Sequence, residues 1–133
     1  IMNLNSFMEK YAQNIDGQYS EYNDNINIII VPLLDDRFQT VFGEIKKYDR
    51  YDRDVIVISS KVCEFEDGID LKDLLSQHSN FCHGKFSIVD QYIQVEATFF
   101  IDNVNESTLE EAIQEVANLA DEYEFKLTGA DVY

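Results

Sequence analysis

The fold class is decided by one stretch of the chain, Asp54-Val55-Ile56-Val57-Ile58-Ser59-Ser60-Lys61-Val62-Cys63-Glu64-Phe65. β-Branched residues are denser here than elsewhere, and branching at Cβ suits an extended strand better than a helix. The four apolar residues 55–58 point alternately to the two faces of a sheet, so both faces should be covered. We therefore expect a central strand with helices on one face and a second apolar contact, such as another subunit, on the other.

A short amphipathic helix is predicted near the start of the chain, over about residues 6–15. Ser6 and Glu9 have the spacing of a capping box, and apolar side chains recur at helical spacing from Phe7 onward. Asp16-Gly17 should end the helix. The polar segment 18–25 that follows is either a loop or the entry to a first strand.

Two strands are predicted before the central one. Residues 26–31 are apolar except for Asn27, and Pro32 should end this strand or lie at a sheet edge. After a turn at 33–37, residues 38–48 form the next strand. Gly43 in its middle suggests a bulge or a close backbone contact.

A short helix, a hairpin and a long helix should follow the central strand. Asp70 is placed to cap a helix that ends near Ser79. Residues 85–89 and 92–101 are predicted strands around a tight turn at 90–91. A second capping box, Ser107 to Glu110, should start the last helix, and Gly129 should stop it. The side chains that we expect to hold the fold together are Val55, Val57, Phe99 and Ile113.

The predicted order is α-β-β-β-α-β-β-α, an α+β fold with an antiparallel sheet and helices packed on one face. The chain has 133 residues, which suffice for one sizeable core but not for two comfortable domains. No linker or low-complexity segment interrupts it. We expect a single α+β domain over residues 1–133.

Charge limits the partners of this protein. The sequence has 26 Asp and Glu against 10 Lys and Arg, a net charge of −16, which repels nucleic acid phosphates and anionic membranes. A basic protein or segment suits this field; the alternative is that the charge only keeps the protein soluble. The chain begins without the pattern of a signal peptide, and no apolar run approaches the ~20 residues of a membrane span. A cytoplasmic protein is expected.

The residues that could form a metal or catalytic site are not spaced as such sites require. Cys63, His78, Cys82 and His83 are zinc-ligand types, but no Cys-x-x-Cys pair exists. A nucleophile and base at Cys82-His83 would point apart in an extended segment, and no acidic cluster fits a calcium loop. Buried thiols and a loop histidine are the simpler explanation. We expect no catalytic, metal or cofactor site, and keep an enzyme that uses carboxylates or Cys82/His83 as the alternative of another class.

Aromatic residues are too numerous to lie under one helical layer: Phe38, Phe42, Tyr48, Tyr51, Phe99 and Phe100. The adjacent residues 99 and 100 must point to opposite sheet faces. The aromatic side chains are either ordinary core and rim or a patch for a subunit or polypeptide. The partner-contact residues we predict are Phe42, Tyr51 and Phe100.

The positive charges are also unevenly distributed. Six of the ten cationic residues lie between positions 37 and 61. They are either alternating surface charge or a mixed-charge strand edge that orients a partner or sets a dimer's register.

Four segments carry a resemblance to a known family: Val57–Cys63, Asp70–Leu75, His83–Ile88 and Ala120–Gly129. Over roughly residues 7–128 the chain resembles the type III secretion chaperone-like family, in particular its YbjN-like branch. The resemblance implies a non-enzymatic, commonly homodimeric α+β protein that binds other polypeptides. With the acidic charge, it suggests a dimer that acts on a basic or partly unfolded client. The alternative binder is an acidic immunity-type inhibitor of a basic toxin.

Overall fold

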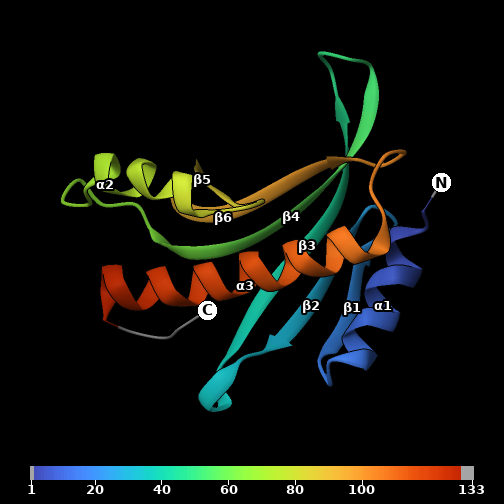
Figure 1. Cartoon of the computed structure of the whole chain (residues 1–133), viewed down its shortest axis with the longest axis horizontal. Coiled ribbons are helices and arrows are strands. Elements are labelled where there is room, and N and C mark those ends of the chain that lie inside the picture. Colours follow the sequence, from blue (N-terminus) through green and yellow to red (C-terminus); the bar gives the residue numbers. More distant parts are fainter. Residues whose placement is uncertain (1, 130–133) are drawn as a thin grey trace.

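Six antiparallel strands form one sheet within residues 2–129, the part of the chain that the computed structural model describes, in the order β1-β2-β3-β4-β6-β5 (Figure 1). The expected domain over residues 1–133 therefore extends beyond the described residues at both ends. The elements in chain order are α1 (Leu4–Asn14), β1 (Gln18–Asn23), β2 (Ile26–Pro32), the 3₁₀ helix η1 (Leu34–Asp36), β3 (Phe38–Tyr48), β4 (Arg53–Glu64), α2 (Leu71–Ser76), the 3₁₀ helix η2 (Gln77–Asn80), β5 (Lys85–Val89), β6 (Tyr92–Phe100) and α3 (Glu106–Thr128).

The α+β class, the antiparallel sheet and the central place of β4 are confirmed. The main difference is β1, the segment left open between a loop and a strand. It pairs with β2 from Gln18↔Ile30 to Asn23↔Ile26 and forms an edge of the sheet. Its side chains are mostly exposed, so its sequence carries no apolar alternation, and only pairing with β2 defines it as a strand.

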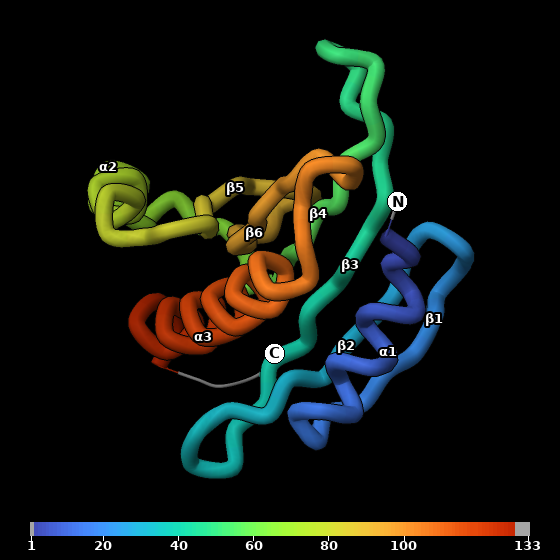
Figure 2. The backbone as a smooth tube through the Cα atoms, turned by 45° about the vertical axis from the view of Figure 1, so that its right-hand side comes forward, coloured from blue at the N-terminus to red at the C-terminus, as the bar shows by residue number. Residues whose placement is uncertain are grey.

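Helices pack on one face of the sheet, as predicted. α1 contacts β1, β2 and β3, and α3 contacts β3, β4 and β6; Figure 2 shows the two helices lying along that face. α2 lies on the same face at the β5 end, where its buried Leu74 joins the core. The largest side chains that are almost completely buried include Met8, Ile29, Ile56, Ile58, Ile93, Leu109 and Ile113.

Both predicted capping boxes are wrong by a few residues. α1 is capped by Asn3, whose Oδ1 accepts from the Ser6 N–H at 3.0 Å, and α3 by Asn105, whose Oδ1 accepts from the Thr108 N–H at 2.8 Å. The Asn lies three residues before Ser6 in α1 and two residues before Ser107 in α3, so each Ser lies inside the first turn of its helix. The predicted stop at Gly129 is confirmed, in the left-handed region at φ 73°.

Gly43 serves a close contact and not a bulge. The register of β3 with β2 and β4 is regular across it. A Cβ at this position would lie 2.6 Å from Asn27 Oδ1 and 2.9 Å from Met8 Cε. Asn27 is completely buried under α1, where its Nδ2 donates to Asn5 Oδ1 at 2.9 Å. The missing side chain lets α1 sit close against β3.

The other face of the sheet is not covered by any helix that the structure describes. Along β2, and along β3 as far as Gly43, the side chains alternate between buried positions under the helices and exposed or partly exposed positions opposite. Val57 of β4, one of the residues expected to hold the fold together, is partly exposed on this side between Glu44 and Thr98, outside the buried core. Val55 is buried but also lies on this side, between Lys46 and Phe100. Ile113 is buried in the core, and Phe99 is partly buried and packs against the core, as predicted.

Candidate functional site

The uncovered side of the sheet, which we call the open face, carries a continuous apolar row. Cross-strand pairs place Ile28 beside Phe42 and Pro32 beside Phe38, and Ile26 and Ile30 flank them on β2. Phe38 is 55% exposed, and the others are partly exposed. Apolar side chains that remain partly in water in a contiguous row are typical of a surface that another polypeptide covers.

An aromatic cluster lies at one end of the open face, where β3 and β4 meet in the hairpin that projects from the sheet (Figure 1). The Tyr48 ring centroid is 5.4 Å from that of Tyr51 and 5.7 Å from that of Phe100. The Arg53 guanidinium lies 3.7 Å from the Phe100 ring centroid and forms an ion pair with Asp102. The hydrogen bond that Arg53 Nη2 donates to Asp102 Oδ1 is the main cause that lowers the pKa of Asp102. The cation is thereby held over the ring.

The structure brings two of the three predicted contact residues together. Tyr51 and Phe100 have ring centroids 5.9 Å apart, although 49 positions separate them in the chain. Phe42 lies on the same face of β3 but outside the cluster. The opposite orientation of Phe99 and Phe100 is also as predicted: Phe99 packs toward the helices, where its ring meets His83 at 5.6 Å.

Sequence reasoning missed the isoleucines of β2 and the cation over the ring, Arg53. Residues 26, 28 and 30 formed part of a continuous apolar run, so nothing in the sequence separated the open face from the buried one. A strand in which polar and apolar residues alternate would have shown which face is exposed. The pairing with β3, which places Ile28 opposite Phe42, shows that Ile28 lies on the open face.

The cationic residues of positions 37–61 do not form a strand edge, because β3 and β4 are interior strands. Among the described residues, three of the six form ion pairs: Arg37 with Asp121, Lys47 with Asp52 and Arg53 with Asp102. Lys46 and Lys61 lie on the open face beside Glu44 and Ser59. Charges of both signs therefore meet on this face, while most of the acidic residues lie elsewhere.

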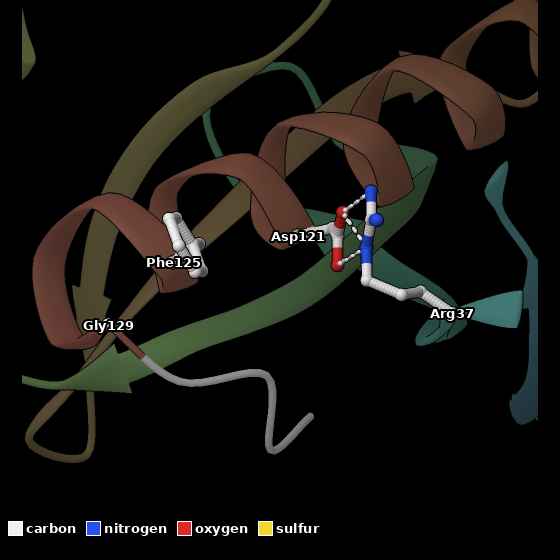
Figure 3. Close-up of a pocket in the computed structure, with 4 residues that line it drawn as sticks. All are labelled: Arg37, Asp121, Phe125 and Gly129. Atoms are coloured by element: carbon white, nitrogen blue, oxygen red, sulfur yellow. Dashed lines mark hydrogen bonds and ion pairs between the residues drawn. The ribbon is translucent and has the colours of Figure 1, made fainter. Parts of the chain in front are cut away.

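A pocket of about 370 Å³ lies between η1 and the C-terminal half of α3 (Figure 3). Arg37, Asp121, Phe125 and Gly129 line it. Arg37 Nε donates to both Asp121 carboxylate oxygens, at 3.1 and 3.2 Å. The two charged groups of the pocket satisfy each other, so it offers an external ligand little electrostatic attraction.

The Cys82-His83 segment is pinned to α3 by a carboxylate. Glu115 accepts hydrogen bonds from the backbone N–H groups of Cys82, His83 and Gly84 at 2.8, 2.6 and 2.6 Å. Partial burial is the largest influence on the pKa of Glu115 and raises it, but the three hydrogen bonds together lower the pKa below its ordinary value. His83 Nε2 lies 3.5 Å from Glu111 Oε2. These polar contacts hold the segment against α3, which is a structural role.

The two cysteines differ. Cys63 is buried, as expected, but Cys82 is exposed, so the expectation of two buried thiols is wrong. No hydrogen bond joins the Cys82 thiol to an imidazole within the described chain, which a nucleophile and base would need. Residues 2–129 also contain no group of three His, Cys, Asp or Glu side chains placed to hold a metal ion. No helix in that range has the length and apolar character of a membrane span.

Comparison with known proteins identifies the fold but no sequence relative. No protein-family model matches the chain, and no curated protein matches it. A chain of the HopA1–SchA chaperone–effector complex superposes with a TM-score of 0.60 at 10% identity, over 93% of this chain and 98% of that one. A chain of the ExsC–ExsE complex superposes with a TM-score of 0.53 at 12% identity, over 93% and 92%. The type III secretion chaperone-like fold implied by the sequence resemblance is thus confirmed.

Proposed function

We propose that this chain is a non-enzymatic, cytoplasmic polypeptide-binding protein that acts as a homodimer on a basic or partly unfolded client. The observation that carries the proposal is the apolar open face of the sheet, which no described helix covers. One of the solved structures that superpose on this chain is a chaperone–effector complex, which supports a polypeptide partner. We also place the chain in the YbjN-like branch, on the sequence resemblance alone.

The open face offers two kinds of contact to a client. The row around Ile28 and Phe42 can bury apolar side chains at about 25 cal/mol for each Å² removed from water. The cluster around Tyr51 and Phe100 adds aromatic rings with a polar tip and a fixed cation, a combination enriched where polypeptides meet. A client segment that lies across β2 and β3 toward the hairpin would reach all three predicted contact residues.

The net charge of −16 acts at longer range. It raises the encounter rate with basic chains and lowers it with acidic ones, an effect that salt weakens. The same field would serve an inhibitor of a folded basic toxin. The two functions differ in whether the client must be unfolded, and this difference can be measured.

The test uses lysozyme, which is basic, in its native form and in a reduced and alkylated, unfolded form. We expect the unfolded form to bind and the native form not to, as measured by fluorescence anisotropy. Tyr51→Asp, at a 61% exposed position, should weaken binding about tenfold, the cost of one buried aromatic contact. Leu34→Asp, at an 81% exposed position on η1, is the matched control and should bind like the wild type.

Equal binding by both variants would overturn the open face as the client surface. Binding of only the native form would favour the inhibitor. The dimer is tested separately by light scattering, which should give twice the 15.5 kDa of one chain. A particle of one chain's mass at micromolar concentration would contradict it.

A further inference from the structure

His78 of η2 lies in a cluster of aromatic rings. Its ring stacks on that of Phe86 in β5 at a centroid distance of 5.5 Å, and its centroid is 5.8 Å from that of Phe81. Both phenylalanine rings pack edge-on with Tyr123 of α3, at centroid distances of 6.2 and 4.9 Å. Tyr123 is buried, and the two phenylalanines are partly buried against the core. The imidazole therefore belongs to a cluster that joins η2, β5 and α3.

The imidazole also holds a backbone group of the sheet. β5 is an edge strand, so one row of its N–H and C=O groups has no partner strand. The N–H of Phe86 donates instead to His78 Nε2, at 2.9 Å. A ring nitrogen accepts a hydrogen bond only when it carries no proton, so the His78 ring is neutral here and its one proton is on Nδ1. This contact exists in one charge state of His78 and in one tautomer.

A second proton on His78 removes the acceptor and adds a charge that nothing close by compensates. Of the two histidines in the sequence, only His83 lies within ion-pair distance of a carboxylate among the described residues. On α3, Glu122 is already paired with Lys126, Oε2 to Nζ at 3.0 Å. The titratable groups on the elements around the ring are Lys72 and Asp73 of α2, Lys85 of β5, and Glu122, Tyr123 and Lys126 of α3.

His83 should respond to acid in the opposite direction. Its Nε2 is buried without a hydrogen-bond partner in the part of the chain that the structure describes, and it lies 3.5 Å from Glu111 Oε2. Its other neighbours are the uncharged Phe99 ring of β6 and Glu115 of α3, which binds the backbone of the same segment. A positive charge on His83 therefore strengthens its contact with α3, whereas a positive charge on His78 breaks its contact with β5.

We propose that the His78–Phe86 hydrogen bond is a pH-sensitive switch that holds η2 against β5 while the ring is neutral and releases it when the ring is protonated. Histidines gain their charge between about pH 8 and pH 5, so the contact is present at the upper end of this range and lost at the lower end. Release frees the Phe86 N–H and opens the aromatic cluster to water. Residues 82–84 stay bound to Glu115, so the opening is confined to η2 and the start of β5.

The test uses NMR on the full wild-type chain. At pH 7.5 a long-range ¹H–¹⁵N spectrum should show His78 with its proton on Nδ1 and with Nε2 bare. Hydrogen exchange, corrected for its intrinsic pH dependence, should show the protection of the Phe86 N–H falling about fivefold between pH 7.5 and pH 5.5, the equivalent of one net hydrogen bond. The N–H of Ile58, in the central strand, should keep its protection.

Three variants separate the two histidines. His78→Gln supplies an uncharged acceptor of similar reach, so the Phe86 N–H should stay protected at both pH values. His78→Lys has a charge and no acceptor, and should leave this N–H unprotected at both. His83→Gln is the matched control, and should show the wild-type fall; it also assigns the ring signals.

A His78 ring with its proton on Nε2 at pH 7.5 overturns the proposal, and this measurement needs no variant. A fall in protection that persists in His78→Gln, or that Ile58 shares equally, also overturns it. The proposed function is not at stake in any of these outcomes, because no client is present in the experiment.

Discussion

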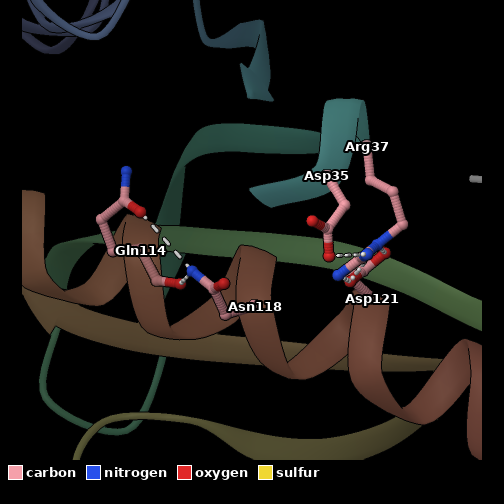
Figure 4. Close-up of polar contacts among 5 residues, drawn as sticks. All are labelled: Asp35, Arg37, Gln114, Asn118 and Asp121. Carbon is pink, nitrogen blue, oxygen red and sulfur yellow. Dashed lines mark hydrogen bonds and ion pairs between the residues drawn. The ribbon is translucent and has the colours of Figure 1, made fainter. Parts of the chain in front are cut away.

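Arg37 and Asp121 join two parts of the chain that are 84 positions apart. Arg37 Nε donates to both carboxylate oxygens and Nη2 lies 2.9 Å from Oδ2, so the guanidinium grips the carboxylate at two atoms (Figure 4). Arg37 follows η1, between β2 and β3, and Asp121 lies on α3 with a side chain only 9% exposed. This pair ties the β2–β3 connection to α3, and the hydrogen bond to Asp121 is the main cause that raises the pKa of Arg37.

Removal of one member of this pair should therefore cost more than removal of its neighbour. Asp121→Ala leaves Arg37 without its buried partner and should lower the free energy of unfolding clearly. Asp35→Ala removes a carboxylate that is 85% exposed and 3.4 Å from Arg37, and should change it little. Urea unfolding of both variants measures the two free energies of unfolding. Equal losses of free energy would mean that the bidentate Arg37–Asp121 contact does not stabilise the fold.

Glu115 should make stability depend on pH. Its folded pKa is lowered, so its stabilisation is fully present above the unfolded value of about 4.3 and is lost as pH falls through the folded pKa. Glu115→Gln should cost about 1–2 kcal/mol at pH 7, the scale of charge-assisted hydrogen bonds at a partly exposed site. The difference between wild type and variant should shrink below about pH 4, when the wild-type carboxylate is protonated. A difference that stays constant down to pH 3 would contradict this role.

Gly43 and Gly68 form a matched pair for backbone contact. Gly43→Ala puts a methyl group 2.6 Å from Asn27 Oδ1 and should destabilise the fold by about 1–3 kcal/mol through overpacking. Gly68→Ala meets no atom within 4 Å and should be neutral or stabilising by up to about 1 kcal/mol. Thermal unfolding of the two variants decides. A harmless Gly43→Ala would show that α1 can shift away from β3.

Ile28 and Ile29 are neighbours in β2 with opposite environments. Ile29 is completely buried under the helices, so Ile29→Ala should cost about 2–5 kcal/mol, transfer and cavity combined. Ile28 lies on the open face, and Ile28→Ala should cost about 1 kcal/mol because less apolar area is lost from burial. The ratio of the two losses in urea unfolding reports whether the open face is uncovered in solution. Equal losses would mean that something covers it.

The two thiols should react at different rates. Burial, and then the charge of Glu124, raise the pKa of Cys63, so little reactive thiolate is present and the reagent has poor access. Cys82 is exposed. A disulfide reagent at pH 8 should modify one thiol quickly and the second only on unfolding, and Cys82→Ser should remove the fast phase. Two fast phases in the folded protein would contradict the burial of Cys63.

The local order of the fold could be predicted from the sequence where a pattern was strong. β3 spans residues 38–48 and β5 spans 85–89 as expected, because apolar residues bounded by turn residues leave little choice. The turn at Asp90-Gln91 has both residues at positive φ, as its tight geometry needs. Helix starts could not be predicted from the sequence, because Asn3 and Ser6 are both good caps. The hydrogen bond from the Ser6 N–H to Asn3 Oδ1, which only the structure shows, identifies Asn3 as the cap.

The candidate site shows the same division. The sequence determined that Phe99 and Phe100 point to opposite faces, since alternation is a property of any strand. Only the tertiary structure decided that Phe100 meets Tyr51, that Arg53 lies over its ring, and that Ile28 faces away from the helices. Side-chain periodicity is encoded by neighbours in the chain, whereas the register between strands and the placement of helices depend on contacts between distant residues. Apolar composition set how much surface had to be buried, and packing alone chose which side of the sheet the helices left uncovered.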